Sequence, residues 1–182
     1  NANVTPVIPS RGSVGASGDL APLSHLALVL CGEGKAMLGD KDMPGKAAIA
    51  AAGLTPIIPV AKEGLALING THLMSSIATL ALADIALICE AAVIATAMSI
   101  DVAKATDSFL DDRIHAARGQ SGQQTVAASL RSHLKNSTIL PSHREDDLRV
   151  QDPYSFRCSP QVLGAAIEAI ARITGTISAE LG

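Results

Sequence analysis

The sequence predicts a mainly α-helical protein whose long helices pack as a bundle, and three observations support this class. The chain has 182 residues, of which 48% are hydrophobic and 17% charged, as in proteins that fold around a core. Residues 64–104 consist almost entirely of Ala, Leu, Ile, Met and Ser, which predicts one dominant helix. No segment alternates apolar and polar residues for long, so we expect no strand of useful length.

The N-terminal part of the chain is expected to combine a loop with two helices. Residues 1–18 are interrupted by Pro and Gly and predict the loop. The apolar run from Leu20 to Leu30 predicts a helix that ends at Cys31-Gly32. Residues 35–60 predict turns around a short Ala-rich helix that Gly53 closes, on the surface between larger helices.

The dominant helix is expected from Gly64 to Lys104, and its interior carries charge only at Asp84, Glu90 and Asp101. We do not expect a membrane span, because polar residues interrupt the uncharged window that precedes Asp84. An apolar helix in any other setting is buried among helices. A helix of about 60 Å is longer than a domain of this size can cover alone, which argues for an oligomeric bundle.

The C-terminal part is expected to hold two shorter helices, a polar segment and a final long helix. A Gly/Gln-rich loop at 119–123 separates the first helix from a second one between Gln124 and Leu134. Residues 142–161 are polar and contain Pro, and a helical repeat resumes from Val162 to Leu181. The sequence begins without Met and stops within this repeat. We therefore expect a single central fragment of a longer chain, residues 1–182, divided into portions 1–60 and 61–182.

The composition argues against several classes of protein. A net charge of −3, with one Tyr, two Phe and no Trp, lacks the basic surface and the stacking aromatics of nucleic-acid-binding proteins. The three cysteines are odd in number and form no CxxC, which favours a reduced intracellular protein. The histidines lack the spacing of metal ligands, so we assign them to structure or surface. They are His25, His72, His115, His133 and His143.

Ala16, Ser17 and Gly18 lie between a glycine-punctuated loop and the first helix. They are not a nucleophile elbow, because Asp19 stands where G-x-S-x-G needs glycine. The glycines of this loop also lack the following Lys-Ser/Thr of a phosphate loop. One interpretation is an ordinary turn, in which the charge of Asp19 in the first helical turn favours the helix dipole.

A second interpretation is a condensation of the backbone with itself. If the Gly18 nitrogen meets the Ala16 carbonyl carbon, a five-membered ring can close. Loss of water from the ring and from the Ser17 hydroxyl then leaves an electrophilic methylidene-imidazolone. Gly18 lacks the Cβ that would block the approach, and Ala16 is small enough for the bend. A helix N-terminus beside the ring would favour negative charge during attack.

Three segments of the chain resemble the histidine ammonia-lyase family of methylidene-imidazolone-dependent aromatic amino acid ammonia-lyases. They are GSVGASGDLAPLSH at 12–25, LINGT at 67–71 and QDPYSFRC at 151–158. Three matches in the same order are not expected by chance, and nearly the whole chain resembles the central part of such an enzyme. The resemblance implies the long-helix bundle of the ammonia-lyase type, similar to fumarase and aspartase, with the cofactor loop at a helix N-terminus.

The resemblance also implies roles for the residues around this loop. Ala16, Ser17 and Gly18 would form the prosthetic group autocatalytically, with no metal and no diffusible coenzyme. Asp19 would help to hold the strained turn. Asn69 would hydrogen-bond near the ring, helping to form it and to position the substrate. Without the resemblance, Asn69 is more simply a break at the start of the long helix.

The third segment would supply the other side of the same pocket. Gln151 and Tyr154 would line it, with Tyr154 near the ring and near the reacting carbons of the substrate. Arg157 would bind the substrate carboxylate by a bidentate ion pair, which its planar fork suits better than lysine would. Tyr154 could instead be a packing residue whose hydroxyl finds a partner. The run 144–147 is interpreted as a solvated face, and its closeness to Gln151 leaves a pocket role open.

The implied reaction is a non-oxidative elimination of ammonia from an amino acid. The substrate amine, or in an older proposal its aromatic ring, adds to the methylidene, a base removes a β-proton, and ammonia departs. In the family, that base lies before residue 1, and an acid that helps to select histidine lies after residue 182. The product would be an α,β-unsaturated acid, which is urocanate when the substrate is histidine.

Two alternatives to a histidine ammonia-lyase stay open. The amino-acid sequence of the first segment and the Gln-Asp-Pro-Tyr sequence of the third resemble the histidine branch of the family. Tyrosine and phenylalanine ammonia-lyases and aminomutases have nearly the same sequences in these segments. A catalytically inactive helical scaffold is the alternative of another class. The family builds each active site from several subunits of a homotetramer, so the implied partner is the chain itself. The expected location is the cytoplasm, without nucleic acid or membrane as partners.

Overall fold

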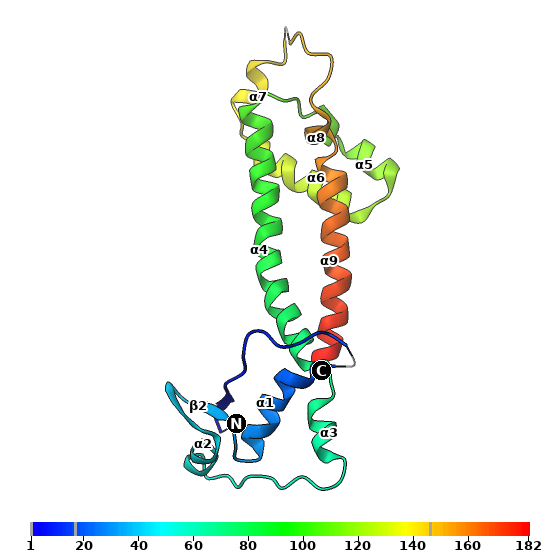
Figure 1. Cartoon of the computed structure of the whole chain (residues 1–182). Coiled ribbons are helices and arrows are strands. Elements are labelled where there is room, and N and C mark those ends of the chain that lie inside the picture. The colour runs from blue at the N-terminus through cyan, green and yellow to red at the C-terminus, as the bar shows by residue number, and fades with distance from the viewer. Residues whose placement is uncertain (1, 17, 146) are drawn as a thin grey trace. The chain divides into compact units, whose positions relative to one another are not determined.

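A computed structural model describes residues 2–16, 18–145 and 147–182, and the chain is mainly helical, as predicted (Figure 1). The chain forms two compact units, residues 1–78 and 79–182. The first unit contains α1 (Leu20–Leu30), α2 (Gly45–Ala51), α3 (Glu63–Ile68) and the first turns of α4 (His72–Val102). The predicted helix from Leu20 to Leu30 and the Ala-rich helix before Gly53 are both confirmed.

The expectation that the chain has no useful strands is wrong for the first unit. β1 (Val4–Pro6), β2 (Lys35–Leu38) and β3 (Lys41–Pro44) form an antiparallel sheet in the order β1-β2-β3. The strands are only three or four residues long, too short for an alternating pattern to be visible. The sheet is stabilised by packing on α1 and α2, where Val29, Ala36, Ala48 and Ile49 form a small buried core.

The prediction of one continuous helix from Gly64 is wrong, because the helix is broken near its start. α3 ends at Ile68, Asn69 has an extended backbone with φ −109° and ψ 104°, and α4 begins at His72. The extended residue stops the helical hydrogen-bond ladder, and a new ladder starts where the Ser75 N–H donates to the Thr71 carbonyl at 2.9 Å. The break thus lies at Asn69-Gly70, and Asn-Gly is a dipeptide that commonly marks a turn or a loop.

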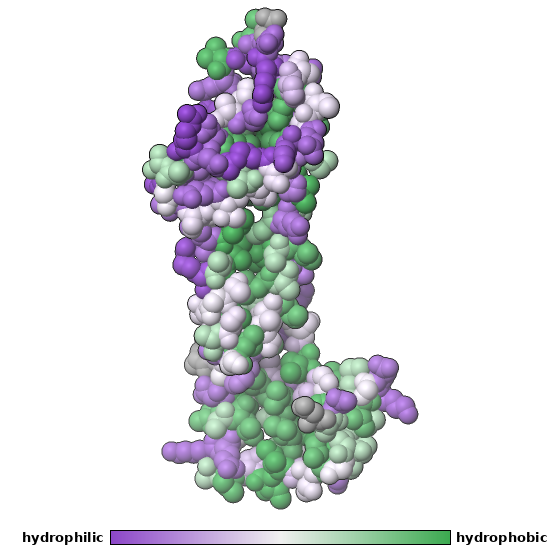
Figure 2. Space-filling model, turned by 180° about the vertical axis from the view of Figure 1, so that it is seen from behind, coloured by the Kyte–Doolittle hydropathy of each residue, from purple (hydrophilic) through white to green (hydrophobic). Residues whose placement is uncertain are grey.

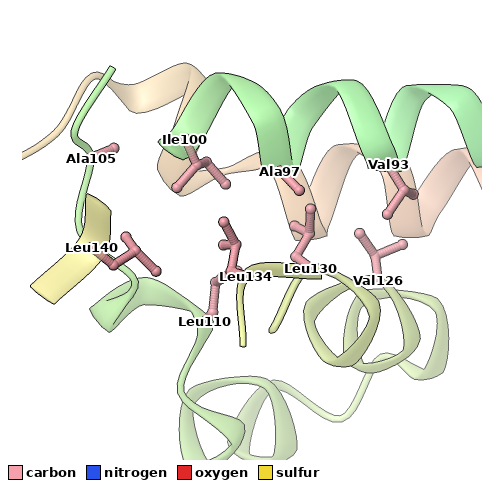
Figure 3. Packing of buried hydrophobic residues seen from close by; sticks show 9 residues of the cluster. All are labelled: Val93, Ala97, Ile100, Ala105, Leu110, Val126, Leu130, Leu134 and Leu140. Carbon is pink, nitrogen blue, oxygen red and sulfur yellow. The ribbon is translucent and has the colours of Figure 1, made fainter. Parts of the chain in front are cut away.

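The described residues of the second unit form the rest of α4, a 3₁₀ turn, η1 (Ser108–Leu110), and five further helices. These are α5 (Asp112–Arg118), α6 (Ser121–Leu134), α7 (Ile139–Ser142), α8 (Tyr154–Arg157) and α9 (Ser159–Leu181). Figure 3 shows how its core forms: side chains of α4 point towards those of α6, η1 and α7. The cluster consists of Val93, Ala97, Ile100, Ala105, Leu110, Val126, Leu130, Leu134 and Leu140.

Helix α6 begins at Ser121, three residues before the predicted start at Gln124, because a distant residue caps it. The carboxylate of Glu168 on α9 accepts hydrogen bonds from the Ser121 hydroxyl at 2.8 Å and from the Gly122 N–H at 2.6 Å. The same hydrogen bonds hold the pKa of Glu168 below its ordinary value. The two helices touch closely there, since a Cβ on Gly122 would lie 2.4 Å from the Gly164 carbonyl oxygen.

Several large apolar side chains on α4 are exposed in the single chain, among them Leu80, Leu87, Ile88 and Met98. Figure 2 shows hydrophobic residues over much of the face that it displays. In the part of the chain that the structure describes, two stretches are long and apolar enough to cross a membrane: Glu63–Val102 and Ser159–Leu181, with 6% of the most apolar window of each buried. Length and composition are weak evidence, because a helix buried among other helices meets the same criteria.

Candidate functional site

The loop that precedes α1 touches the break between α3 and α4. Gly18 has φ +104°, a conformation that only glycine adopts readily. A Cβ at Gly18 would lie 3.1 Å from both the nitrogen and the oxygen of Gly70, and 3.4 Å from Oδ1 of Asn69. The structure therefore brings together two of the predicted site residues, Gly18 and Asn69, and a Cβ at Gly18 would require Gly70 or the loop to shift by a few tenths of an ångström.

Asp19 fixes this loop to the start of α4. Its side chain is buried, with 0% of the residue exposed. Oδ1 accepts a hydrogen bond from the Ser13 hydroxyl at 2.5 Å, and Oδ2 accepts one from the Met74 N–H at 3.0 Å. Its own N–H donates to the Gly70 carbonyl at 3.1 Å.

The position of Asp19 differs from the simple helix-dipole interpretation. Asp19 is the N-cap residue of α1, but its side chain makes no capping hydrogen bond to α1. It binds instead one of the N-terminal N–H groups of α4, which have no partner within that helix. Ala16 is exposed, and Ser17 lies outside the described residues.

Gln151, Tyr154 and Arg157 belong to the second unit, where a buried aspartate holds the segment that carries them. The Oδ2 atom of Asp152 accepts hydrogen bonds from the N–H of Thr106 at 2.8 Å and from its hydroxyl at 2.6 Å. Thr106 follows the end of α4, so Asp152 anchors the 151–157 segment to the core. Sequence analysis missed Asp152. The only available signal was an acidic residue inside a recognised motif, because Thr106 lies 46 positions away.

Arg157 and Tyr154 lie together on α8. The Arg157 Nε donates to the Asp152 carbonyl at 3.0 Å, and its guanidinium carbon lies 5.6 Å from the centre of the Tyr154 ring. This distance is that of a cation–π contact. Tyr154 is 71% exposed in the single chain, so it is not a buried packing residue here.

A hollow of about 260 Å³ lies beside this segment and contains two of the predicted residues, Gln151 and Arg157. Asp147 and Arg149 also line it. Hydrogen bonds from the Arg149 guanidinium and backbone N–H hold the pKa of Asp147 well below its ordinary value. The run 144–147 is therefore not one uniform solvated face: Arg144 pairs with Asp107 at an exposed position, and Asp147 reaches the hollow. Asp146 lies outside the described residues.

His115 is a satisfied core residue, as its assignment to structure predicts. It is 1% exposed, with Nε2 at 3.0 Å from the Phe109 carbonyl and Nδ1 at 2.9 Å from the Gln123 side-chain amide. Within the described ranges, no three or more His, Cys, Asp or Glu side chains are grouped so that they could hold a metal ion.

Comparisons with known proteins agree on one family. Residues 1–182 match the family described as aromatic amino acid lyase. A histidine ammonia-lyase from Paracidovorax citrulli (strain AAC00-1) is 47% identical over 180 residues, which are 99% of this chain and 35% of that protein.

Two solved structures extend the comparison to the fold. The phenylalanine aminomutase of Pantoea agglomerans superposes with a TM-score of 0.83 at 31% identity, covering 100% of this chain and 38% of its own. Histidine ammonia-lyase from Trypanosoma cruzi gives a TM-score of 0.76 at 40% identity, covering 99% of this chain and 32% of its own. The 182 residues therefore span 32–38% of the length of these three relatives.

Proposed function

The chain belongs to the aromatic amino acid lyase family, and from this premise we propose that the protein eliminates ammonia from L-histidine to give urocanate. The observation that carries the proposal is the 47% identity to a histidine ammonia-lyase along 99% of this chain. The TM-score of 0.83 with a phenylalanine aminomutase favours a second candidate, elimination or amino-group migration on phenylalanine or tyrosine.

The prosthetic group proposed for this reaction is a methylidene-imidazolone made from Ala16, Ser17 and Gly18. The described residues fit its formation, because Gly18 has a positive φ that disfavours a side chain and lies in tight contact with the Gly70 backbone. The condensation would join the Gly18 nitrogen to the Ala16 carbonyl carbon and release two waters, one of them carrying the Ser17 hydroxyl oxygen. The group supplies an electrophilic double bond, which ordinary side chains lack.

The remaining site residues would bind and orient the substrate. Within the part of the chain that the structure describes, Arg157 hydrogen-bonds through Nε alone, which leaves its two terminal nitrogens for a carboxylate. Asn69, whose amide oxygen lies against Gly18, would orient groups beside the ring. Gln151 and the exposed Tyr154 would line the same pocket, with the Tyr154 hydroxyl near the reacting carbons.

A second copy of the chain is part of the proposal. The exposed apolar side chains of α4 are of the kind that become buried when helices of several subunits pack together. We propose a homotetramer whose subunits share active sites. A cytoplasmic location fits the three free cysteines, Cys31, Cys89 and Cys158.

Comparing substrates tests the proposal. The full polypeptide that carries these residues would be incubated with histidine, tyrosine or phenylalanine, and the absorbance of the unsaturated acid followed over time. The expected result is that histidine gives the largest kcat/KM. Turnover of phenylalanine or tyrosine alone would favour the second candidate. Absence of elimination from all three would contradict an ammonia-lyase, and an intact peptide mass at 16–18 would then favour the inactive scaffold.

Removing the charge of Asp152 is expected to weaken substrate binding. Asp152→Asn replaces two charge-assisted hydrogen bonds to Thr106 by weaker ones and loosens the segment that presents Arg157. We expect KM to rise about tenfold while kcat changes much less. Steady-state kinetics with the preferred substrate would measure both constants. The matched control is Asp111→Asn, which neutralises a partly exposed carboxylate paired with Arg113, while asparagine can keep the cap of α5. An unchanged KM in Asp152→Asn would contradict the role of this anchor.

A further inference from the structure

Ser13 connects the two ends of the segment that would form the ring. Its hydroxyl donates to Oδ1 of Asp19 at 2.5 Å and accepts the N–H of Gly15 at 3.1 Å. Gly15 immediately precedes Ala16, and Asp19 immediately follows Gly18. One hydroxyl therefore joins the residue before the reactive tripeptide to the residue after it.

The downstream end of this connection is a rigid anchor. The Asp19 carboxylate is buried and already holds the Met74 N–H of α4, while the Asp19 N–H is bonded to the Gly70 carbonyl. Among the described residues, the Ser13 hydroxyl is the hydrogen-bond partner that keeps the upstream end, at Gly15, near this anchor. Gly15 is exposed and has φ +65°, and a Cβ there would meet nothing within 4 Å, so packing does not fix it.

Ring closure requires an uncommon approach of backbone atoms inside the tripeptide. Holding both ends in place lowers the entropy that the chain must lose to reach that geometry. A hydrogen bond to a carboxylate is charge-assisted, and such bonds are about twice as strong as neutral ones. The Ser13–Asp19 bond is therefore well suited to hold the two ends of the tripeptide in place.

We propose that Ser13 is a positioning residue for the autocatalytic condensation of Ala16, Ser17 and Gly18, acting through Asp19 and Gly15. This inference rests on the proposed function, since it presupposes that the ring forms. Ser13 does not contribute an atom to the ring and does not touch the substrate. Its effect is on the rate at which newly folded protein acquires the prosthetic group.

The test is the rate of dehydration in Ser13→Ala. The full polypeptide would be synthesised in a short pulse, and the peptide containing residues 11–19 followed by mass spectrometry. Ring formation removes two waters, about 36 Da. We expect the Ser13→Ala protein to lose this mass at least about tenfold more slowly than the unchanged protein, which is the factor for one charge-assisted hydrogen bond. Ser13→Thr keeps the hydroxyl and should restore the rate.

Two further variants separate positioning from general stability. Ser24→Ala removes a hydroxyl of α1 that donates to the Leu20 carbonyl at 2.7 Å, so it should leave the rate unchanged. Ser13→Cys keeps a weak hydrogen-bond donor in nearly the same volume, so its rate of dehydration should lie between those of the unchanged protein and Ser13→Ala. This variant keeps the test decisive should Ser13→Ala fold poorly. Circular dichroism would show whether each variant keeps its helices.

The outcomes distinguish this inference from the function on which it rests. If the unchanged protein keeps the full mass of the peptide, the proposed prosthetic group is wrong. If the unchanged protein loses two waters and Ser13→Ala does so at the same rate, the role of Ser13 is wrong. Equal slowing in Ser13→Ala and Ser13→Thr would also contradict it, because the hydroxyl would then not be the cause.

Discussion

Replacing Ser17 with alanine is expected to abolish the loss of two waters from the peptide at 16–18 and to lower kcat/KM at least about 10³-fold. The reason is chemical: alanine has no hydroxyl to leave, so the exocyclic double bond cannot form. The proposed binding residues Asn69 and Arg157 would remain, so we expect substrate still to bind. Mass spectrometry of the peptide and the absorbance of the unsaturated product would measure the two effects separately.

The control for Ser17→Ala is a serine outside the tripeptide. Ser10→Ala removes a hydroxyl from the same loop and should change neither the peptide mass loss nor kcat/KM. Circular dichroism and gel filtration should show that Ser17→Ala keeps the helices and the oligomeric state of the unchanged protein. Ammonia release at the unchanged rate from Ser17→Ala would rule out the proposed prosthetic group.

Gly18→Ala is expected to prevent ring formation by a different physical route. A side chain at φ +104° is strained by about 1–2 kcal/mol. Its Cβ would also lie 3.1 Å from the backbone nitrogen and oxygen of Gly70, so the loop or Gly70 would have to shift by a few tenths of an ångström. We expect the mass loss to fall below detection on the time scale on which the unchanged protein matures, with kcat/KM reduced in proportion.

Gly15→Ala is the matched control for Gly18→Ala. Gly15 also has a positive φ, +65°, but an added Cβ would meet nothing within 4 Å. The strain is therefore of a similar kind, without the contact to Gly70. We expect Gly15→Ala to mature more slowly than the unchanged protein but far faster than Gly18→Ala. Equal rates for the two variants would show that backbone strain, and not the closeness of Gly70, limits the condensation.

The sequence predicts the helices well where the signal is local. The helix from Leu20 to Leu30 has an apolar run and a glycine stop, and both bounds are confirmed. The final helix begins at Ser159, close to the predicted start at Val162. The start of α6 was missed because its cap, Glu168, comes from another helix, and a pattern within α6 carries no information about it.

The difference between local signals and long-range contacts also explains which site residues could be predicted from the sequence. Motif residues such as Gly18, Asn69 and Arg157 stand in recognisable segments, and the contact of Gly18 with Asn69 agrees with a shared role. Asp152 and Ser13 are ordinary residue types whose importance depends on partners. The carboxylate of Asp152 meets Thr106, and Ser13 meets a carboxylate that is itself bound to α4. Such long-range pairings are set by the folded chain.

The bond between Asp19 and the Met74 N–H spans 55 positions of the sequence, and this has a consequence for the order of events during protein synthesis. A nascent chain that has emerged only as far as α3 contains the complete tripeptide but not the helix end that fixes its carboxylate anchor. The proposed condensation therefore lacks this anchor until the first turn of α4 has left the ribosome and folded. On the proposed function, we expect maturation to follow the translation of α4, a segment distant from the tripeptide in the sequence.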